Sequence, residues 1–521
     1  MKELIALGAV ITWAFLLGVT SLLHRPEQLY SSDYLFGDQG VNLLVADTIT
    51  SGGLPYRDVA YPYGPLPIYI YAGLTELCGN RIPTYYCYML VWSLLHLALL
   101  YLAVRRFCSR LVTSIVGVLA FVPTMLIPGA MVGGYANAAY IPVERCLLTA
   151  LVLVYVAPSR RSYGRATLIG LFLGALQFTK FGGCFFVGGA IVILDLLLLR
   201  AEKEGSRNHT RWIKISLTTL AAFVAVEFVR AGLAFSFLNS EIAWDVVWPT
   251  FAARAYTTLS PDTRRPGWVN LSYFLGQQLT AFVGLIFSVI GLAHLALLTR
   301  SSSFSDPSPR GDEAALLLLP LFYCISAAAY FGHVHTYIQY AWCLMLAIPY
   351  ALPRLGIAAK AITTVVALPC ALLMLKSVLF SPLPPDVAPV RLPNGDTVFT
   401  DPPTSMAIEG IERECERLRL QDVSGQRNKV LILPQGAGYH YYFHYPRISR
   451  NVWYINYYFR PYDGPAFLAA LDTTLAIVFV GTDDKYIDNP LVFPPDIAQA
   501  IRSRLGPPVA VTPHCSVFPV R

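Results

Sequence analysis

GGLPYRDVAYPYGPLP, residues 52–67, lies between two hydrophobic segments near the start of this 521-residue chain. Its glycines and prolines predict a turn after Gly52 and argue against a regular helix before Ile68. The preceding residues, 38–50, predict a short helix that lies in a membrane interface. Residues at helical spacing form one largely apolar stripe on it: Val41, Leu44, Val45, Thr48 and Ile49. The two features together predict a structured loop at a membrane surface.

The composition excludes a soluble globular protein. Hydrophobic residues make up 55% of the chain, charged residues only 14%, and the mean hydropathy is +0.51. Segments long enough to cross a bilayer recur as far as Phe380 and predict a polytopic α-helical membrane protein with about eleven spans. These are Leu4–Leu23, Ile82–Val104, Leu111–Pro128, Val143–Ala157, Ala166–Thr179, Cys184–Leu199, Ile215–Ala234, Val269–Leu298, Ala314–Phe331, Tyr337–Leu352 and Ile357–Phe380.

Lysine and arginine gather in one set of alternate loops, and such loops stay on the cytoplasmic side during insertion. This pattern predicts a multi-pass membrane protein with a cytoplasmic N-terminus. We expect the membrane to be a bacterial inner or plasma membrane. The first external loop (24–81), the segment 235–268 and everything after residue 380 then share the external face. No cleavage site follows the first segment, so we expect a retained anchor. The net charge of +7 comes mostly from cytoplasmic loops and does not indicate nucleic-acid binding.

A proline-rich stretch at 381–385 separates the predicted membrane domain, residues 1–380, from a C-terminal segment, residues 381–521. Two buried strands, at 429–434 and 475–481, alternate there with helical patterns at 404–420 and 495–505. We therefore predict a small extracytoplasmic α/β domain.

The C-terminal segment also carries aromatic tracts at 439–445 and 453–459. Tyrosine and tryptophan suit both a membrane-facing packing surface and a sugar subsite, and packing is the favoured interpretation. The ten cysteines form no metal-ligand spacing, and a disulfide between Cys415 and Cys515 is left open.

Asp38 and Arg57 are the first candidates for chemistry. A carboxylate at the N-terminal end of a helix is stabilised in its ionised form, which suits a general base or a cation ligand. The equal alternative is that Asp38 only caps the helix. Arg57 has a planar donor fork that matches phosphate, or it forms a weak surface ion pair with Asp58.

These residues resemble a known family. Asp-x-Gly-Val at 38–41, Gly-Gly-x-Pro-Tyr-Arg-Asp at 52–58 and Pro-Tyr-Gly-Pro at 62–65 look like the first periplasmic loop of GT-C fold glycosyltransferases, which include protein mannosyltransferases and the aminoarabinose transferases of lipid A. The glycine-rich segment 170–182 is also similar to a helix of such enzymes. The resemblance covers the membrane domain in outline, and the loop is its most specific part.

The resemblance implies transfer of a hexosyl or pentosyl group from a polyprenyl-phosphate donor to a lipid, glycan or protein acceptor in cell-envelope glycan biosynthesis. Asp38 matches the catalytic base. Many relatives have Asp-Glu where this chain has Asp38-Gln39, so the second acid is missing. No lysine occurs between Glu3 and Arg105, so phosphate binding falls to Arg57, Lys180 or another residue.

Other polar residues have two interpretations each. Lys180 faces a polar cavity or snorkels from a helix end. Glu144-Arg145 form a packing pair or line the donor cavity, and the pair Glu227 and Arg230 is expected to pack. Residues expected to line the cavity are Tyr56, Asp58, Tyr61, Arg145, His333 and His335.

We therefore expect an inverting transfer in which Asp38 deprotonates the acceptor while Arg57 and Lys180 hold the departing phosphate. The expected partners are the polyprenyl-phosphate sugar, its acceptor and membrane lipids, without nucleic acid. No pattern indicates a cofactor, and a divalent metal is left open without a ligand set. The alternatives are a multi-pass transporter or lipid-linked sugar flippase, and a non-catalytic scaffold that binds through its external domain.

Overall fold

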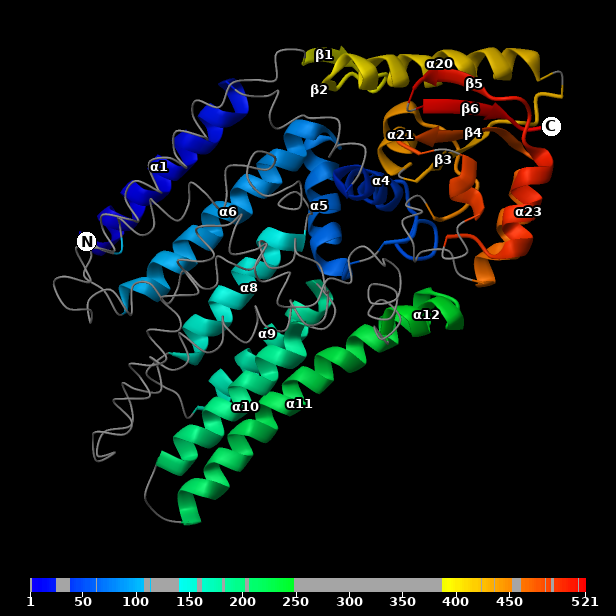
Figure 1. Ribbon diagram of the computed structural model, residues 1–521. Coiled ribbons are helices and arrows are strands. Elements are labelled where there is room, and N and C mark those ends of the chain that lie inside the picture. Colours follow the sequence, from blue (N-terminus) through cyan, green and yellow to red (C-terminus); the bar gives the residue numbers. More distant parts are fainter. Residues whose placement is uncertain are drawn as a thin grey trace, which may run out of the picture.

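The computed structural model describes residues 2–24, 38–61, 63–106, 113, 140–156, 162–179, 183–201, 206–247, 387–422, 424–434, 436–451, 461–482, 484–488, 492–513 and 515–521. Long helices run side by side through the first half of the chain (Figure 1). They are α1 (Lys2–His24), α6 (Ile82–Arg105), α8 (Tyr140–Tyr155), α9 (Tyr163–Thr179), α10 (Gly183–Ala201) and α11 (Ser206–Phe237).

Each of these helices coincides with a predicted span. Within the described residues, Ile82–Arg105 and Thr210–Phe237 are long and apolar enough to cross a membrane by the criteria of length and composition. The predicted spans at 111–128, 269–298, 314–331, 337–352 and 357–380 lie outside the described residues except for Thr113. The total of about eleven spans stays a prediction.

Small residues bring α9 against α11. A Cβ built on Gly170 would lie closer than 3.0 Å to the carbonyl oxygen of Thr219, and one built on Gly174 would overlap the side chain of Val226. Such a glycine pair, four residues apart, lets two helix backbones approach closely, a common contact between helices in membranes.

The basic ends of several helices gather at the end of the array far from the C-terminal residues (Figure 1). Arg105, at the end of α6, forms an ion pair of 2.8 Å with Glu3 of α1. Arg106 donates to the carbonyl oxygen of Val156, 3.3 Å away, just beyond α8. This grouping is what the charge pattern predicts, while the assignment of that end to the cytoplasm stays a prediction.

The C-terminal residues contain a four-stranded sheet in the order β3-β4-β6-β5. Strand β3 (Lys429–Leu433) is parallel to β4 (Thr474–Val480), and β6 (Cys515–Pro519) is antiparallel to both β4 and β5 (Val509–Thr512). The strands and helices expected in this segment are present. The helices are α20 (Pro402–Gln421), α21 (Ala437–Phe443), α22 (Gly464–Leu471) and α23 (Pro495–Arg504), with short 3-10 turns η3 (Pro461–Asp463) and η4 (Asp484–Asp488).

Successive side chains of β3 point to opposite sides of the sheet, and both sides are apolar. Val430 and Ile432 contribute to one buried cluster, together with α20 and α21, whereas Leu431 and Leu433 contribute to another, with α22 and α23. A hairpin of β1 (Ala388–Arg391) and β2 (Thr397–Thr400) precedes α20. Cys415 and Cys515, for which a disulfide was an alternative, are both buried free thiols.

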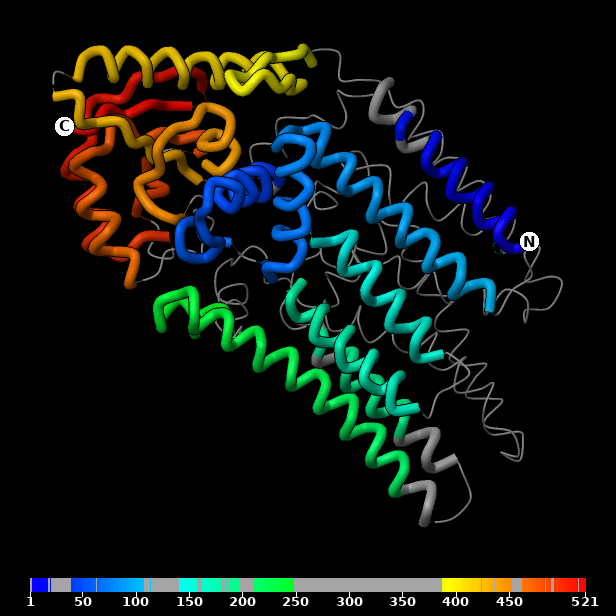
Figure 2. Tube along the Cα trace, turned by 180° about the vertical axis from the view of Figure 1, so that it is seen from behind, coloured from blue at the N-terminus to red at the C-terminus, as the bar shows by residue number. Residues whose placement is uncertain are grey.

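Helix α4 (Asp38–Thr50) connects the helical array to this sheet. We expected one apolar stripe facing a membrane interface, and the structure corrects this. Residues on all sides of α4 are buried, because α5 (Pro65–Cys78) packs against it from one direction and α21 from another. One apolar cluster runs from α4 into the sheet, so α4 is a core helix between the two parts of the chain (Figure 2).

The start of α5 is a second correction. Prolines were expected to exclude a helix before Ile68, but α5 begins at Pro65. Pro65 and Pro67 lie in its first turn, where the amide nitrogens have no partner inside the helix and the fixed proline φ is already helical.

Candidate functional site

Asp38 is the first residue of α4. Its backbone therefore lies at the positive end of the helix dipole, which is the position predicted from the sequence. The Asp38 side chain is outside the part of the chain that the structure describes, and its role as a base stays a prediction.

Buried polar contacts hold the first turns of α4. The Tyr86 hydroxyl donates to Gln39 Oε1 at 3.3 Å, and the Tyr61 hydroxyl donates to Asn42 Oδ1 at 3.1 Å. Asn42 Nδ2 in turn lies 3.4 Å from the Tyr85 hydroxyl. Burial raises the pKa of Tyr61, so this residue acts as a neutral hydrogen-bond donor. Tyr61 thus lies in the core beside α4, while its contact with substrate stays a prediction.

The turn after α4 is built by Asp58. The Asp58 amide donates to the carbonyl oxygen of Leu54 at 2.9 Å, and Asp58 Oδ2 accepts from the Leu54 amide at 2.7 Å. Gly52 has a φ of 84°, in the left-handed region that glycine enters without strain. The turn therefore closes on a reciprocal pair of hydrogen bonds between Leu54 and Asp58.

Arg57 forms an ion pair with Asp58, the simpler of its two expected interpretations. The Nε and Nη2 atoms of Arg57 lie 2.9 and 2.7 Å from the Asp58 carboxylate oxygens, and the Arg57 side chain is 49% exposed. The hydrogen bond from Arg57 lowers the pKa of Asp58. Arg57 follows the C-terminal end of α4, whereas Asp38 begins this helix, which is roughly 18 Å long.

The loop continues through a cluster of tyrosine rings. The Tyr56 hydroxyl donates to the carbonyl oxygen of Tyr63 at 2.5 Å, and the Tyr63 ring lies 4.2 Å, centroid to centroid, from Tyr140 of α8. Tyr56 is buried in the loop interior. One residue on, the Gly64 amide donates to the carbonyl oxygen of Thr179 at 3.1 Å. This loop therefore sits on the end of α9, immediately before Lys180, which is outside the described residues.

The other predicted positions divide into three groups. Glu144 and Arg145 are both buried on α8, and lining of a donor cavity by Arg145 stays a prediction. Arg230 and Glu227 form an ion pair inside the protein, as expected, with Arg230 Nη2 2.6 Å from Glu227 Oε2. His333 and His335 lie outside the described residues.

Arg230 also holds α12 (Ser240–Val247), a short helix that follows α11. Its guanidinium donates to the carbonyl oxygens of Val246 at 2.7 Å and Val247 at 2.9 Å. A cation at these terminal carbonyls complements the helix dipole. Asn239 caps the other end of α12 by accepting from the Ile242 amide at 2.8 Å.

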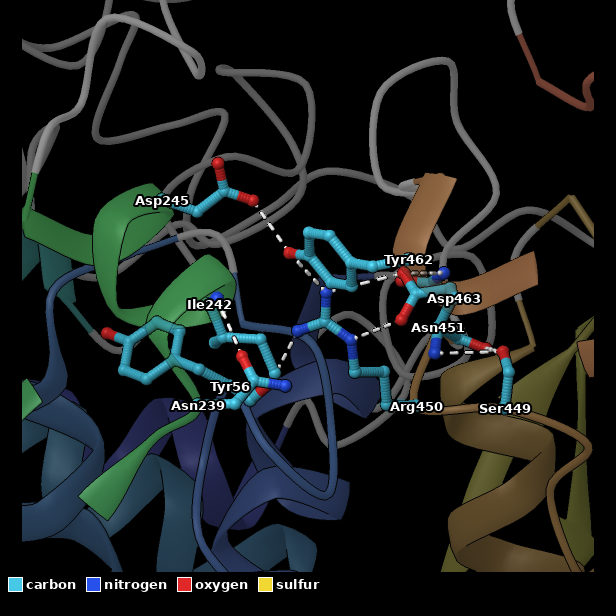
Figure 3. A network of polar contacts seen from close by, with 9 residues as sticks. All are labelled: Tyr56, Asn239, Ile242, Asp245, Ser449, Arg450, Asn451, Tyr462 and Asp463. Carbon is cyan, nitrogen blue, oxygen red and sulfur yellow. Dashed lines mark hydrogen bonds and ion pairs between the residues drawn. The ribbon is translucent and has the colours of Figure 1, made fainter. Parts of the chain in front are cut away.

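Arg450 is a residue that the sequence analysis missed. Figure 3 shows its guanidinium between the loop and the C-terminal sheet. Nε donates to Asp463 Oδ1 at 2.7 Å, Nη2 donates to the Tyr462 hydroxyl at 2.7 Å, and Nη1 donates to the carbonyl oxygen of Tyr56. The Tyr462 hydroxyl donates in turn to Asp245 of α12 at 2.7 Å. No local pattern signals this network, because Arg450 and Tyr56 are 394 residues apart.

Most of the aromatic tract at 439–445 packs inside the protein, as favoured. Tyr439, Tyr441 and Tyr442 are buried, and the Tyr441 hydroxyl donates to the carbonyl oxygen of Asn80 beside α6. The second tract, 453–459, lies outside the described residues. Among the described residues, no group of three or more histidine, cysteine, aspartate or glutamate side chains could hold a metal ion.

The chain is similar to a known family model and to several solved structures. A family model described as a 6-pyruvoyl-tetrahydropterin synthase related domain, membrane protein, matches residues 60–261. ArnT from Cupriavidus metallidurans, bound to undecaprenyl phosphate, aligns over 97% of this chain and 98% of its own, with a TM-score of 0.52 and 14% identity. The apo state of the same ArnT gives a TM-score of 0.50, with 14% identity over 98% of both chains.

The archaeal oligosaccharyltransferase AglB from Archaeoglobus fulgidus, in complex with an inhibitory peptide and a dolichol-phosphate, aligns over 99% of this chain and 74% of its own. Its TM-score is 0.51 and its identity 12%. The chain has the GT-C fold. No curated protein matches it in sequence. The fold and the family description agree with the composition in making it an integral membrane protein.

Proposed function

We propose that this protein is a membrane glycosyltransferase that uses a polyprenyl-phosphate-linked sugar as its donor. The observation that carries the proposal is the fold: ArnT aligns over 97% of this chain and 98% of its own, with a TM-score of 0.52. That relative is bound to undecaprenyl phosphate, and AglB is in complex with dolichol-phosphate. A lipid phosphate is therefore the ligand that this fold favours for the present chain.

In the proposed reaction, the Asp38 carboxylate removes the proton from an acceptor hydroxyl, and the oxygen attacks the anomeric carbon of the sugar. The bond between that carbon and the phosphate oxygen breaks, and polyprenyl phosphate leaves with the electron pair. Attack opposite the leaving group inverts the anomeric centre. The acceptor is a lipid, a glycan or a protein, and the sugar is a hexose or a pentose.

The departing phosphate needs a cation near it. We assign this role first to Lys180, because Gly64 joins the loop to Thr179, the residue immediately before it. Arg57 is the second candidate and would have to exchange its Asp58 partner for phosphate. A lysine at the end of an apolar helix either snorkels to the membrane interface or faces a polar cavity or ligand, and the proposal assigns the second arrangement to Lys180.

Purified full-length protein, incubated with a panel of undecaprenyl-phosphate sugars and membrane extract as acceptor, tests the proposal. We expect release of free undecaprenyl phosphate, measured by mass spectrometry, and loss of that release in Asp38→Asn. Undiminished release in Asp38→Asn would remove Asp38 as the base. Substrate movement across vesicles without any transfer product would instead favour the transporter or flippase.

A further inference from the structure

The backbone and the side chain of Arg450 hold the same turn at both ends. The guanidinium donates to the carbonyl oxygen of Tyr56, and the Arg450 carbonyl oxygen accepts from the Ala60 amide at 2.8 Å. Between these contacts lie only residues 57–59, which include the exposed Arg57. Within the turn, the Tyr56 amide donates to the carbonyl oxygen of Val59 at 2.7 Å.

Arg450 is itself fixed from the C-terminal side. Asp463 accepts from it through both carboxylate oxygens, at 2.7 and 3.3 Å, and also accepts from Asn451 Nδ2 at 3.2 Å. The guanidinium carbon lies 4.9 Å from the centre of the Tyr462 ring. The Arg450 and Asp463 side chains are 12% and 8% exposed. A planar fork with three partners in fixed directions has little freedom to move.

The ion pair between Arg450 and Asp463 is not needed simply to hold α4 against the C-terminal sheet. An apolar cluster already joins α4 to the sheet, and a buried ion pair is often no more stabilising than apolar residues of the same volume. What the pair adds is direction, because the hydrogen bonds of Arg450 are satisfied only when the turn holds one position relative to Tyr462 and Asp463.

The same turn leads directly into the loop that meets α9. Tyr56 contacts the carbonyl oxygen of Tyr63, and the following Gly64 contacts Thr179. Displacement of the turn at Tyr56 would therefore move the whole segment from Arg57 to Gly64.

We propose that Arg450 is a positioning residue, through which the C-terminal sheet sets the turn at residues 56–60 and the adjoining lipid-phosphate site. The importance of the turn for lipid phosphate rests on the proposed function, whereas its dependence on Arg450 does not. Tyr462 extends the contact to Asp245, so α12 is linked to the same turn.

Hydrogen–deuterium exchange of the full-length protein in detergent, without lipid, tests the first part. In Arg450→Met we expect peptides covering residues 56–61 to exchange about tenfold faster or more, the change that accompanies loss of a charged hydrogen bond. Arg502→Met is the matched control, since the Arg502 side chain is 36% exposed and its hydrogen bonds and ion pairs go to Asp484 and Asp488, neither of which bonds to the turn among the described residues. Arg502→Met should leave the exchange rate of the peptides covering residues 56–61 unchanged.

A double variant separates positioning from stability. Arg450→Met leaves the Asp463 carboxylate buried without its cation, and Arg450→Met with Asp463→Asn removes that charge. We expect the double variant to regain most of the melting temperature but not the slow exchange of the turn. Recovery of both, or slow exchange in Arg450→Met itself, would overturn the proposal.

Affinity for undecaprenyl phosphate, measured on the same proteins, tests the second part. We expect Arg450→Met and the double variant to bind about tenfold more weakly than wild type, and Arg502→Met to bind normally. Unchanged affinity alongside a released turn would overturn the link to the lipid site. A wild-type protein that binds no undecaprenyl phosphate would instead refute the proposed function, while the exchange result would still decide the role of Arg450.

Discussion

The amide of Gly64 donates a hydrogen bond of 3.1 Å to the carbonyl oxygen of Thr179, which fastens the first loop to the end of α9. The approach is so close that a Cβ on Gly64 would lie within 3.0 Å of the Phe178 carbonyl oxygen. Only glycine allows this backbone contact, and it places the start of α5 beside the residue that precedes Lys180.

Gly64→Ala should therefore be destabilising. The added methyl group meets backbone atoms, which cannot rotate away, so the loop or α9 must shift at a cost of about 1–3 kcal/mol. Thermal unfolding in detergent measures the effect. Gly73→Ala, within α5, is the matched control, because its Cβ would meet nothing within 4 Å and alanine favours a helix. Equal melting temperatures for the two variants would contradict the contact.

Gly170→Ala should weaken the contact between α9 and α11 in the same way. The new methyl group would overlap the Thr219 carbonyl oxygen and the Ala222 side chain, so the helices must separate. We expect a lower melting temperature in detergent. Gly189→Ala on α10, where a Cβ would meet nothing within 4 Å, should have no such effect. A Gly170→Ala protein as stable as wild type would show that the helices tolerate a wider spacing.

The sequence predicts local structure well, because local patterns determine it. Long apolar runs indicate α6 and α11, and the short continuous apolar runs of β3 and β4 indicate buried strands. What surrounds α4 is not local. Its partner α21 comes nearly 400 residues later in the chain. The sequence therefore predicts that the apolar side of α4 faces a membrane, whereas in the structure α21 covers it.

The candidate site shows the same limit. Asp58 and Arg57 are neighbours, and their ion pair is predictable from adjacency. The contact of Arg450 with Tyr56 is not, because an arginine between two aromatic tracts carries no sign of a partner 394 residues away. The start of α5 was missed for a different reason: prolines that break a helix interior are tolerated in its first turn.

Arg57 and Asp58 should have separable effects. The Arg57 side chain is half exposed and its ion pair is screened by water, so Arg57→Met should leave the free energy of unfolding almost unchanged. If Arg57 contacts lipid phosphate, the same variant should weaken undecaprenyl phosphate binding. Asp58→Ala should instead lower stability, because it removes the acceptor of the Leu54 amide that closes the turn. Equal stability of the two variants in chemical or thermal unfolding would contradict this division.

His440 should make the stability of the protein sensitive to acid. The ring is buried on α21, and Nδ1 lies 2.9 Å from the carbonyl oxygen of Tyr445, so the neutral ring with Nδ1 protonated fits as a donor. Burial lowers the pKa of His440 to about 4, whereas it is about 6.5 in the unfolded chain. Between these values the unfolded state binds more protons. Stability from this residue is therefore complete above about pH 6.5 and falls by roughly 3 kcal/mol as the pH drops through 4.

His440→Gln, which keeps a donor but does not titrate, should remove this loss. The informative quantity is the difference in unfolding free energy between wild type and variant from pH 7 to 4, since burial raises the pKa of Asp47 and of Asp396 and these groups act in the opposite direction. His444→Asn is the control, because His444 is exposed and asparagine accepts its φ of 53°. A wild-type curve parallel to that of His440→Gln would show that the buried ring does not titrate in this range.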